Sequence, residues 1–211
     1  MTLRTAAPVL ALALVASVAT AQVGKHLDLL EPNTATEQQL AAVPGLNTAI
    51  AKSIVERRPF ASALALDSLL GQTLSRDQRT EVYKKLFLHI DLNAASREEI
   101  LLIPGSGSRH VREFQEYRPY KALAVWHREM RKYWDEAEVS RLEGYVFVPL
   151  DLNTAADSAI MTIPGMTARM LREFKEYRPY DAVERYKREM AKYVNAKEVE
   201  RLARYVKMQK E

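Results

Sequence analysis

Residues 91–120 read DLNAASREEILLIPGSGSRHVREFQEYRPY, and residues 151–180 read DLNTAADSAIMTIPGMTARMLREFKEYRPY. The same order of an Asn, a Pro-Gly pair and an Arg-Pro-aromatic triplet recurs, more diverged, at residues 33, 44–45 and 58–60. Residues 91–150 align with 151–210 without a gap and share 29 identical positions of 60. A period of this length is typical of one small folded unit that is repeated along the chain.

Each period carries the start and stop signals of short helices. Thr36 and Ser96 begin capping boxes with a Gln or Glu three residues later, and the Pro-Gly pair then ends the first helix. A second helix follows and ends at Arg-Pro, because the residue before a proline avoids the helical region. Further caps at Ser75, Asp135 and Asn195 open a last helix in each period. The sequence therefore predicts an all-α fold of three tandem repeats, each of about 60 residues.

The first 21 residues have the pattern of a cleavable signal peptide. Arg4 precedes an apolar run from Val9 to Ala19, and Ala19-Thr20-Ala21 fits a small-x-small cleavage site. The apolar stretch is too short to cross a hydrocarbon core of ~30 Å comfortably, although an uncleaved membrane anchor is the alternative. We therefore expect an exported protein, located in the periplasm or outside the cell.

With the signal peptide at residues 1–21, the predicted repeats occupy residues 22–90, 91–150 and 151–211. The linkers between them are short and apolar, without a Gly/Ser spacer. We expect the repeats to stack into one rod-like or curved body.

The composition is that of a globular protein with modest positive charge. The chain is 47% hydrophobic and 27% charged, which argues against disorder. Its formal net charge of +4 permits a polyanionic partner, but dedicated nucleic-acid-binding proteins are usually more basic. The chain has no cysteine, which excludes disulfides and thiolate metal sites.

Nothing in the sequence indicates catalysis. Four histidines, His26, His89, His110 and His127, lie at no metal-ligand spacing. A Ser-His-Asp order, a zinc signature and a nucleotide-binding phosphate loop are all absent from the sequence. We predict that the protein is not an enzyme and uses no metal, cofactor or small-molecule substrate.

The succession Asp-Leu-Asn-x-Ala, short helix, Ile-Pro-Gly, second helix and Arg-Pro-aromatic resembles the tandem helix-hairpin-helix domain. The closest resemblance is to the ComEA-like family of exported competence proteins, and it covers roughly residues 30–90, 91–150 and 151–207. It implies non-specific binding of double-stranded DNA, in which hairpin N–H groups contact backbone phosphates at the start of the second helix. A role in DNA uptake is the corresponding expectation.

Carried over by position, the resemblance implies nine residues that contact phosphate. Hairpin glycines would supply main-chain N–H groups, and basic residues in the following helix would supply charge. These residues are Gly45, Lys52, Gly105, Gly107, Arg109, Arg112, Gly165, Arg169 and Arg172.

The hairpins depart from the Pro-Gly-apolar-Gly pattern of that family, which keeps a second function open. Only the second hairpin has the second glycine, Gly107, whereas Asn47 and Thr167 replace it in the others. The alternative is an extracytoplasmic protein-interaction scaffold, a role that other exported helix-hairpin-helix proteins serve. Tyr120 and Tyr180 would then lie exposed on a repeated surface, although packing beneath the hairpin also explains them.

Overall fold

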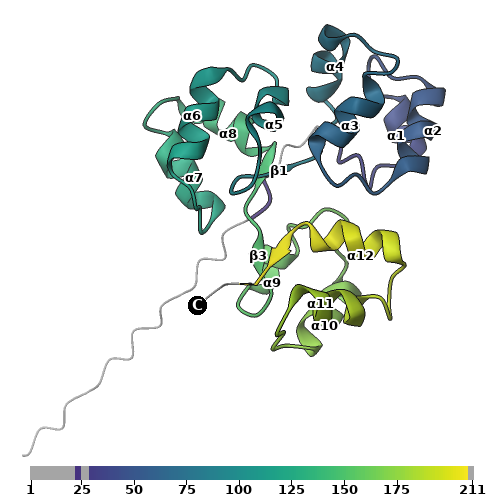
Figure 1. The fold of residues 1–211 in the computed structure, drawn as a ribbon, viewed down its shortest axis with the longest axis vertical. Helices are drawn as coiled ribbons and strands as arrows, with labels where there is room; N and C mark the ends of the chain where they lie inside the picture. The colour runs from purple at the N-terminus through teal and green to yellow at the C-terminus, as the bar shows by residue number, and fades with distance from the viewer. Residues whose placement is uncertain (1–21, 25–28, 209–211) are drawn as a thin grey trace, which may run out of the picture.

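The fold comes from a computed structural model, which describes residues 22–24 and 29–208. The predicted signal peptide lies outside these residues. As predicted, the described part of the chain is mostly helical, with twelve short helices and four two-residue strands. Three helical lobes, residues 29–88, 89–148 and 149–208, surround a centre that contains the strands (Figure 1). Within the described ranges, none of the helices has the length and apolar character needed to cross a membrane.

The first lobe contains α1 (Glu37–Ala41), α2 (Thr48–Arg57), α3 (Ala63–Leu70) and α4 (Arg76–Tyr83). The second contains β1 (Ile90–Asp91), α5 (Arg97–Leu102), α6 (Ser108–Glu116), α7 (Leu123–Met130), α8 (Glu136–Glu143) and β2 (Val146–Phe147). The third contains β3 (Leu150–Asp151), α9 (Asp157–Ile160), α10 (Ala168–Glu176), α11 (Val183–Met190), α12 (Ala196–Ala203) and β4 (Val206–Lys207). The predicted N-caps are confirmed at Thr36, Ser75, Ser96, Asp135 and Asn195, whose side chains each accept a backbone N–H of the first turn.

Short parallel strand pairs join the beginning of a lobe to its end, and the sequence did not predict them. β1 pairs with β2, and β3 pairs with β4. In the first lobe an isolated parallel bridge between Leu30 and Leu86 takes the same place. Strands this short carry no alternating pattern that could be recognised in the sequence.

The Asn of each period is hydrogen-bonded to the aromatic residue of the Arg-Pro-aromatic triplet. In the second lobe Asn93 Nδ2 donates to the Tyr120 carbonyl at 2.9 Å, and Asn93 Oδ1 accepts the Tyr120 N–H at 2.6 Å. The same two bonds occur in the first and third lobes. They direct the aromatic side chain into the lobe, where Tyr120 and Tyr180 are only 1% and 3% exposed. Of the two alternatives for these tyrosines, packing beneath the hairpin is therefore confirmed, and the exposed interaction surface is wrong.

The arginine of the triplet has an equally structural role. Arg118 donates from Nε to the Leu92 carbonyl at 2.5 Å and from Nη2 to the Ala95 carbonyl at 2.7 Å. Equivalent bonds from Arg58 and Arg178 repeat this arrangement. The triplet thus connects the end of the second helix to the loop that precedes the first helix.

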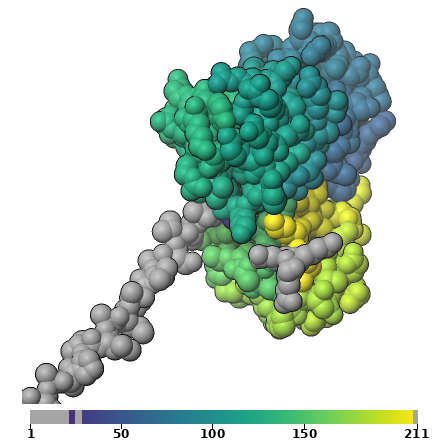
Figure 2. Space-filling view, turned by 60° about the vertical axis from the view of Figure 1, so that its left-hand side comes forward, coloured from purple at the N-terminus to yellow at the C-terminus, as the bar shows by residue number. Residues whose placement is uncertain are grey.

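The lobes do not form the rod or curved stack that the linkers suggested, because the third lobe folds back against the first. Arg204 donates from Nε to the Ala61 carbonyl at 2.9 Å and from Nη2 to the His89 carbonyl at 3.0 Å. In Figure 2 the blue surface of the first lobe accordingly lies against the yellow end of the third. The short, apolar linkers indicate that consecutive lobes lie close together. They carry no information on which faces of the lobes meet.

Residues Gln22–Gly24 insert into the centre between the lobes. The Gly24 N–H donates to the Val146 carbonyl at 3.0 Å, and the Val148 N–H donates to the Gln22 carbonyl at 2.9 Å. Val23 is only 2% exposed and belongs to the hydrophobic cluster of the third lobe. This short segment is therefore joined to the second lobe by an isolated antiparallel bridge between Val23 and Phe147, and it packs into the core of the third lobe.

His89 lies at the same centre and is 6% exposed, with Nε2 at 3.1 Å from the Gly24 carbonyl oxygen. Burial lowers the pKa of His89 to about 4. The hydrogen bond with the Gly24 carbonyl raises this pKa, and the positive charge of Arg204 lowers it, but both effects are smaller than that of burial. The imidazole is therefore neutral near pH 7.

Gly24 has no room for a side chain, because a Cβ would lie 1.6 Å from the carbonyl oxygen of Glu143. We expect Gly24→Ala to displace the inserted segment, because the new methyl group would clash with the Glu143 carbonyl and Val23 would leave the core. The free energy of unfolding should fall by about 3 kcal/mol. Urea unfolding followed by circular dichroism measures this change. Gly107→Ala is the matched control, since its Cβ would meet nothing within 4 Å. Equal midpoints for the two variants would contradict the prediction.

The buried His89 predicts an acid-sensitive contribution to stability. Its pKa of about 4 in the folded protein lies below the value of about 6.5 in the unfolded chain, so the unfolded chain takes up the proton first as the pH falls. Between about pH 6.5 and about pH 4 the free energy of unfolding should fall by up to about 3 kcal/mol on this account. His89→Gln should remove that fall.

The comparison between variant and wild type is needed because burial raises the pKa of Glu31, which acts in the opposite direction. Urea unfolding at several pH values gives the slope of stability against pH for each protein. Parallel slopes for wild type and His89→Gln would refute the assignment.

Candidate nucleic-acid interface

A Pro-Gly hairpin separates the first two helices of each lobe. Gly45, Gly105 and Gly165 have φ angles of 88°, 80° and 75°, a left-handed conformation that glycine adopts without strain. All three glycines are exposed. The predicted glycines therefore form tight turns at the surface, directly before the helix whose N-terminus would face a phosphate.

The three helices that follow these hairpins begin in different ways. At the start of α2 the Asn47 side chain accepts the Ile50 N–H at 2.9 Å, and at the start of α10 the Thr167 hydroxyl accepts the Met170 N–H at 3.2 Å. Gly107, the N-cap of α6, has no side chain that could do so. Because a cap occupies one of the N–H groups that an anion would use, the first turn of α6 is the most open of the three.

His110 lies beside this open turn. Its Nδ1 accepts the Gly107 N–H at 3.1 Å, and its ring stacks on Trp134 with centroids 4.5 Å apart. Partial burial lowers the pKa of His110, which favours the neutral ring that can accept this bond. The N–H groups left for a ligand are therefore those of the α6 helix itself.

The predicted cations lie on the exposed faces of the second helices, and two of them have acidic partners. Lys52 is 3.9 Å from Glu56 on α2, and both side chains are well exposed. Arg112 donates from Nη2 to the buried Glu113 at 2.5 Å. Arg172 is exposed on α10.

Arg109 and Arg169 lie over aromatic rings. The guanidinium carbon of Arg109 is 5.4 Å from the ring centroid of Trp134, and that of Arg169 is 6.0 Å from the ring centroid of Tyr193. A cation–π contact uses the face of the guanidinium and none of its N–H groups. These two arginines are therefore oriented by the protein while their donors stay available.

The surroundings of the three hairpins differ in part, although Gly105 and Gly165 each lie beside an arginine of the last helix in their lobe. A Cβ at Gly45 would face Val82 of the same lobe, and one at Gly165 would lie 3.1 Å from Thr34 of the first lobe. Gly105 instead lines a groove that opens toward the first lobe. Among the residues that the structure describes, no group of three His, Cys, Asp or Glu side chains could hold a metal ion.

Two arginines that the sequence analysis did not predict as site residues donate hydrogen bonds to the hairpins. Arg141 on α8 donates to the Pro104 carbonyl at 2.8 Å, and Arg201 on α12 donates to the Pro164 carbonyl. Each also donates twice, at 2.6 to 2.7 Å, to a glutamate three residues earlier in its helix. A Glu-x-x-Arg pattern at the 60-residue step was the signal that could have found them.

Comparison with known proteins bears on the first of these hairpins. A family model described as the helix-hairpin-helix motif matches residues 28–71, which include α1, α2, α3 and the hairpin glycine Gly45. No curated protein and no solved structure matches the chain significantly. Residues 28–71 thus carry a helix-hairpin-helix motif, a type of motif that commonly binds nucleic acid.

Proposed function

We propose that this protein binds double-stranded DNA without sequence preference, through main-chain N–H groups of its hairpins and nearby arginines. The observation that supports the proposal best is the second hairpin, where Gly105 makes a left-handed turn, Gly107 leaves the first turn of α6 uncapped and Arg109 keeps its donors available. A helix N-terminus with an adjacent cation attracts a phosphate group. The helix-hairpin-helix motif at residues 28–71 is in keeping with this function.

In this proposal the three lobes are three copies of the motif, with unequal contributions. The self-capped starts of α2 and α10 leave fewer N–H groups at the first and third hairpins. The second lobe therefore carries most of the affinity, with Gly105, Gly107, Arg109 and Arg112, and the first and third add weaker contacts. Those weaker contacts come from Gly45, Lys52, Gly165, Arg169 and Arg172.

The proposed setting of this activity is outside the cytoplasm, in the uptake or retention of extracellular DNA. Support for export comes from the sequence pattern of residues 1–21, and support for uptake comes from the resemblance to ComEA-like proteins. The protein acts in this proposal by binding alone, with no catalytic step and no cofactor.

A second candidate function is an extracytoplasmic protein-interaction scaffold. The pairing of Arg112 with Glu113 and the caps at Asn47 and Thr167 favour it, because they withdraw charge and N–H groups from any phosphate. The small net charge of +4 also favours the scaffold, because DNA-binding proteins are usually more basic.

Gly107→Asp separates the DNA proposal from the scaffold. A carboxylate at this N-cap would occupy the first-turn N–H groups of α6 and repel phosphate, whereas the backbone at φ −141° and the open space around Gly107 tolerate the side chain. We expect binding of a labelled DNA duplex to weaken about tenfold, and the slope of log affinity against log salt to fall by about one. Fluorescence anisotropy at about 50 mM and about 200 mM salt measures both quantities.

Gly107→Ala is the matched control, since it adds a side chain without an acceptor, and its affinity should equal that of the wild type. Circular dichroism checks that both variants keep their helix content. Absence of wild-type binding at about 50 mM salt would exclude the DNA function and favour the scaffold.

A further inference from the structure

A groove of about 410 Å³ lies between the first and second lobes, at the second hairpin. One wall consists of side chains from α3 and α4, including Asp67, Arg76 and Arg79. The other wall consists of α5 residues and the hairpin residues 103–106. The hairpin that the proposed function depends on therefore faces the neighbouring lobe across a shared space.

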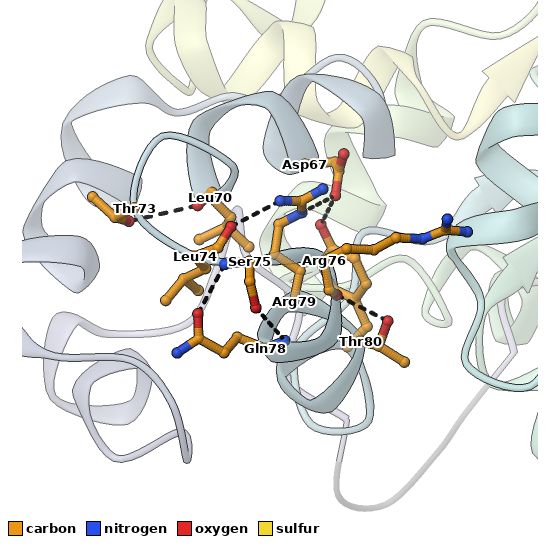
Figure 3. Close-up of polar contacts among 10 residues, drawn as sticks. Asp67, Leu70, Thr73, Leu74, Ser75, Arg76, Gln78, Arg79 and Thr80 are labelled. Atoms are coloured by element: carbon orange, nitrogen blue, oxygen red, sulfur yellow. Dashed lines mark hydrogen bonds and ion pairs between the residues drawn. The ribbon is translucent and has the colours of Figure 1, made fainter.

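Two of the charged side chains in this groove neutralise each other. Arg79 donates from Nε to Asp67 at 2.7 Å and from Nη1 to the Leu74 carbonyl at 2.9 Å, as Figure 3 shows. The Tyr83 hydroxyl donates to the same Asp67 oxygen at 2.6 Å. This pair is part of the packing of the first lobe and has little capacity left for a ligand.

Arg76 differs from Arg79 in this respect. It is exposed at the first position of α4, and it forms no ion pair with any residue in the described ranges. In Figure 3 its side chain extends away from the Arg79–Asp67 pair. The groove thus contains a guanidinium group whose donors are unused within the described structure.

The hairpin wall adds a second unused donor. The Ser106 Oγ atom is buried and has no hydrogen-bond partner. A buried hydroxyl without a partner costs stability. Because Ser106 lines the groove, rotation about its Cα–Cβ bond would bring the hydroxyl to an anionic oxygen there, which would accept its proton. Guanidinium, hydroxyl and main-chain N–H groups are the donors that proteins use for nucleic-acid phosphates.

We propose that this groove holds a backbone phosphate of bound DNA between Arg76 of the first lobe and the second hairpin. The inference rests on the proposed DNA function and deepens it, because the phosphate site is then built from two lobes. Glu98 lies exposed on the α5 wall of the same groove and opposes the phosphate. The groove therefore contains one residue that should strengthen binding and one that should weaken it.

Arg76→Ala and Glu98→Gln test the site with opposite expected signs. In duplex-binding titrations on the full chain, we expect Arg76→Ala to weaken binding about tenfold and to lower the salt slope by about one. Glu98→Gln should tighten binding about threefold, the effect of removing one exposed like charge. Arg57→Ala is the matched control, because Arg57 is an exposed arginine of the first lobe outside the groove.

Inorganic phosphate gives a second readout that is independent of DNA. In ¹⁵N-labelled wild-type protein, phosphate should shift the amide resonances of Gly105 and Ser106, and these shifts should be lost in Arg76→Ala. Unshifted amides would overturn the groove as a phosphate site.

The failures of the two proposals can be told apart. If Gly107→Asp weakens DNA binding while Arg76→Ala and Glu98→Gln behave like Arg57→Ala, the groove assignment is wrong and the DNA function stands. If wild-type protein binds no duplex at low salt, the DNA function is wrong. The groove is then not a DNA-binding site either.

Discussion

The position of every hairpin depends on two hydrogen bonds between an asparagine side chain and the backbone of an aromatic residue 27 positions later. This pair fixes the loop before the first helix against the end of the second helix. The arginine before the proline adds two bonds to the same loop. Because these bonds fix the two outer ends of the helix pair, the Pro-Gly turn between the helices lies at the opposite end, where its glycine is exposed in each lobe.

This division explains which positions differ among the lobes. The asparagine and the Arg-Pro-aromatic triplet make their bonds inside the lobe, and a change there would leave buried groups without partners. The third residue after each Pro-Gly proline points outward and is Asn47, Gly107 or Thr167. Each of these starts a helix acceptably, so folding places little constraint on them. They are nevertheless the residues that decide how many N–H groups an anion can reach.

Local features of the fold could be predicted from the sequence, because caps, glycines and prolines act within a few residues. The N-caps at Ser96 and Asp135 and the left-handed turn at Gly105 are such cases. The strands and the packing of the lobes could not, since they depend on contacts such as that between Arg204 and Ala61, which lie 143 residues apart. The same limit applies to the candidate site: the hairpin glycines could be identified in the sequence, but the groove that brings Arg76 of the first lobe to Gly105 of the second could not.

The inserted segment Gln22–Gly24 depends on parts of the chain that lie far away in the sequence. Its partners include the Thr162 hydroxyl, 139 residues further along, and the backbone of residues 146–148. These partners lie in the second lobe and in the third, so the binding site for residues 22–24 exists only when both lobes are folded and packed together. Docking of this short segment therefore reports on the packing of two lobes to which it does not belong in the sequence.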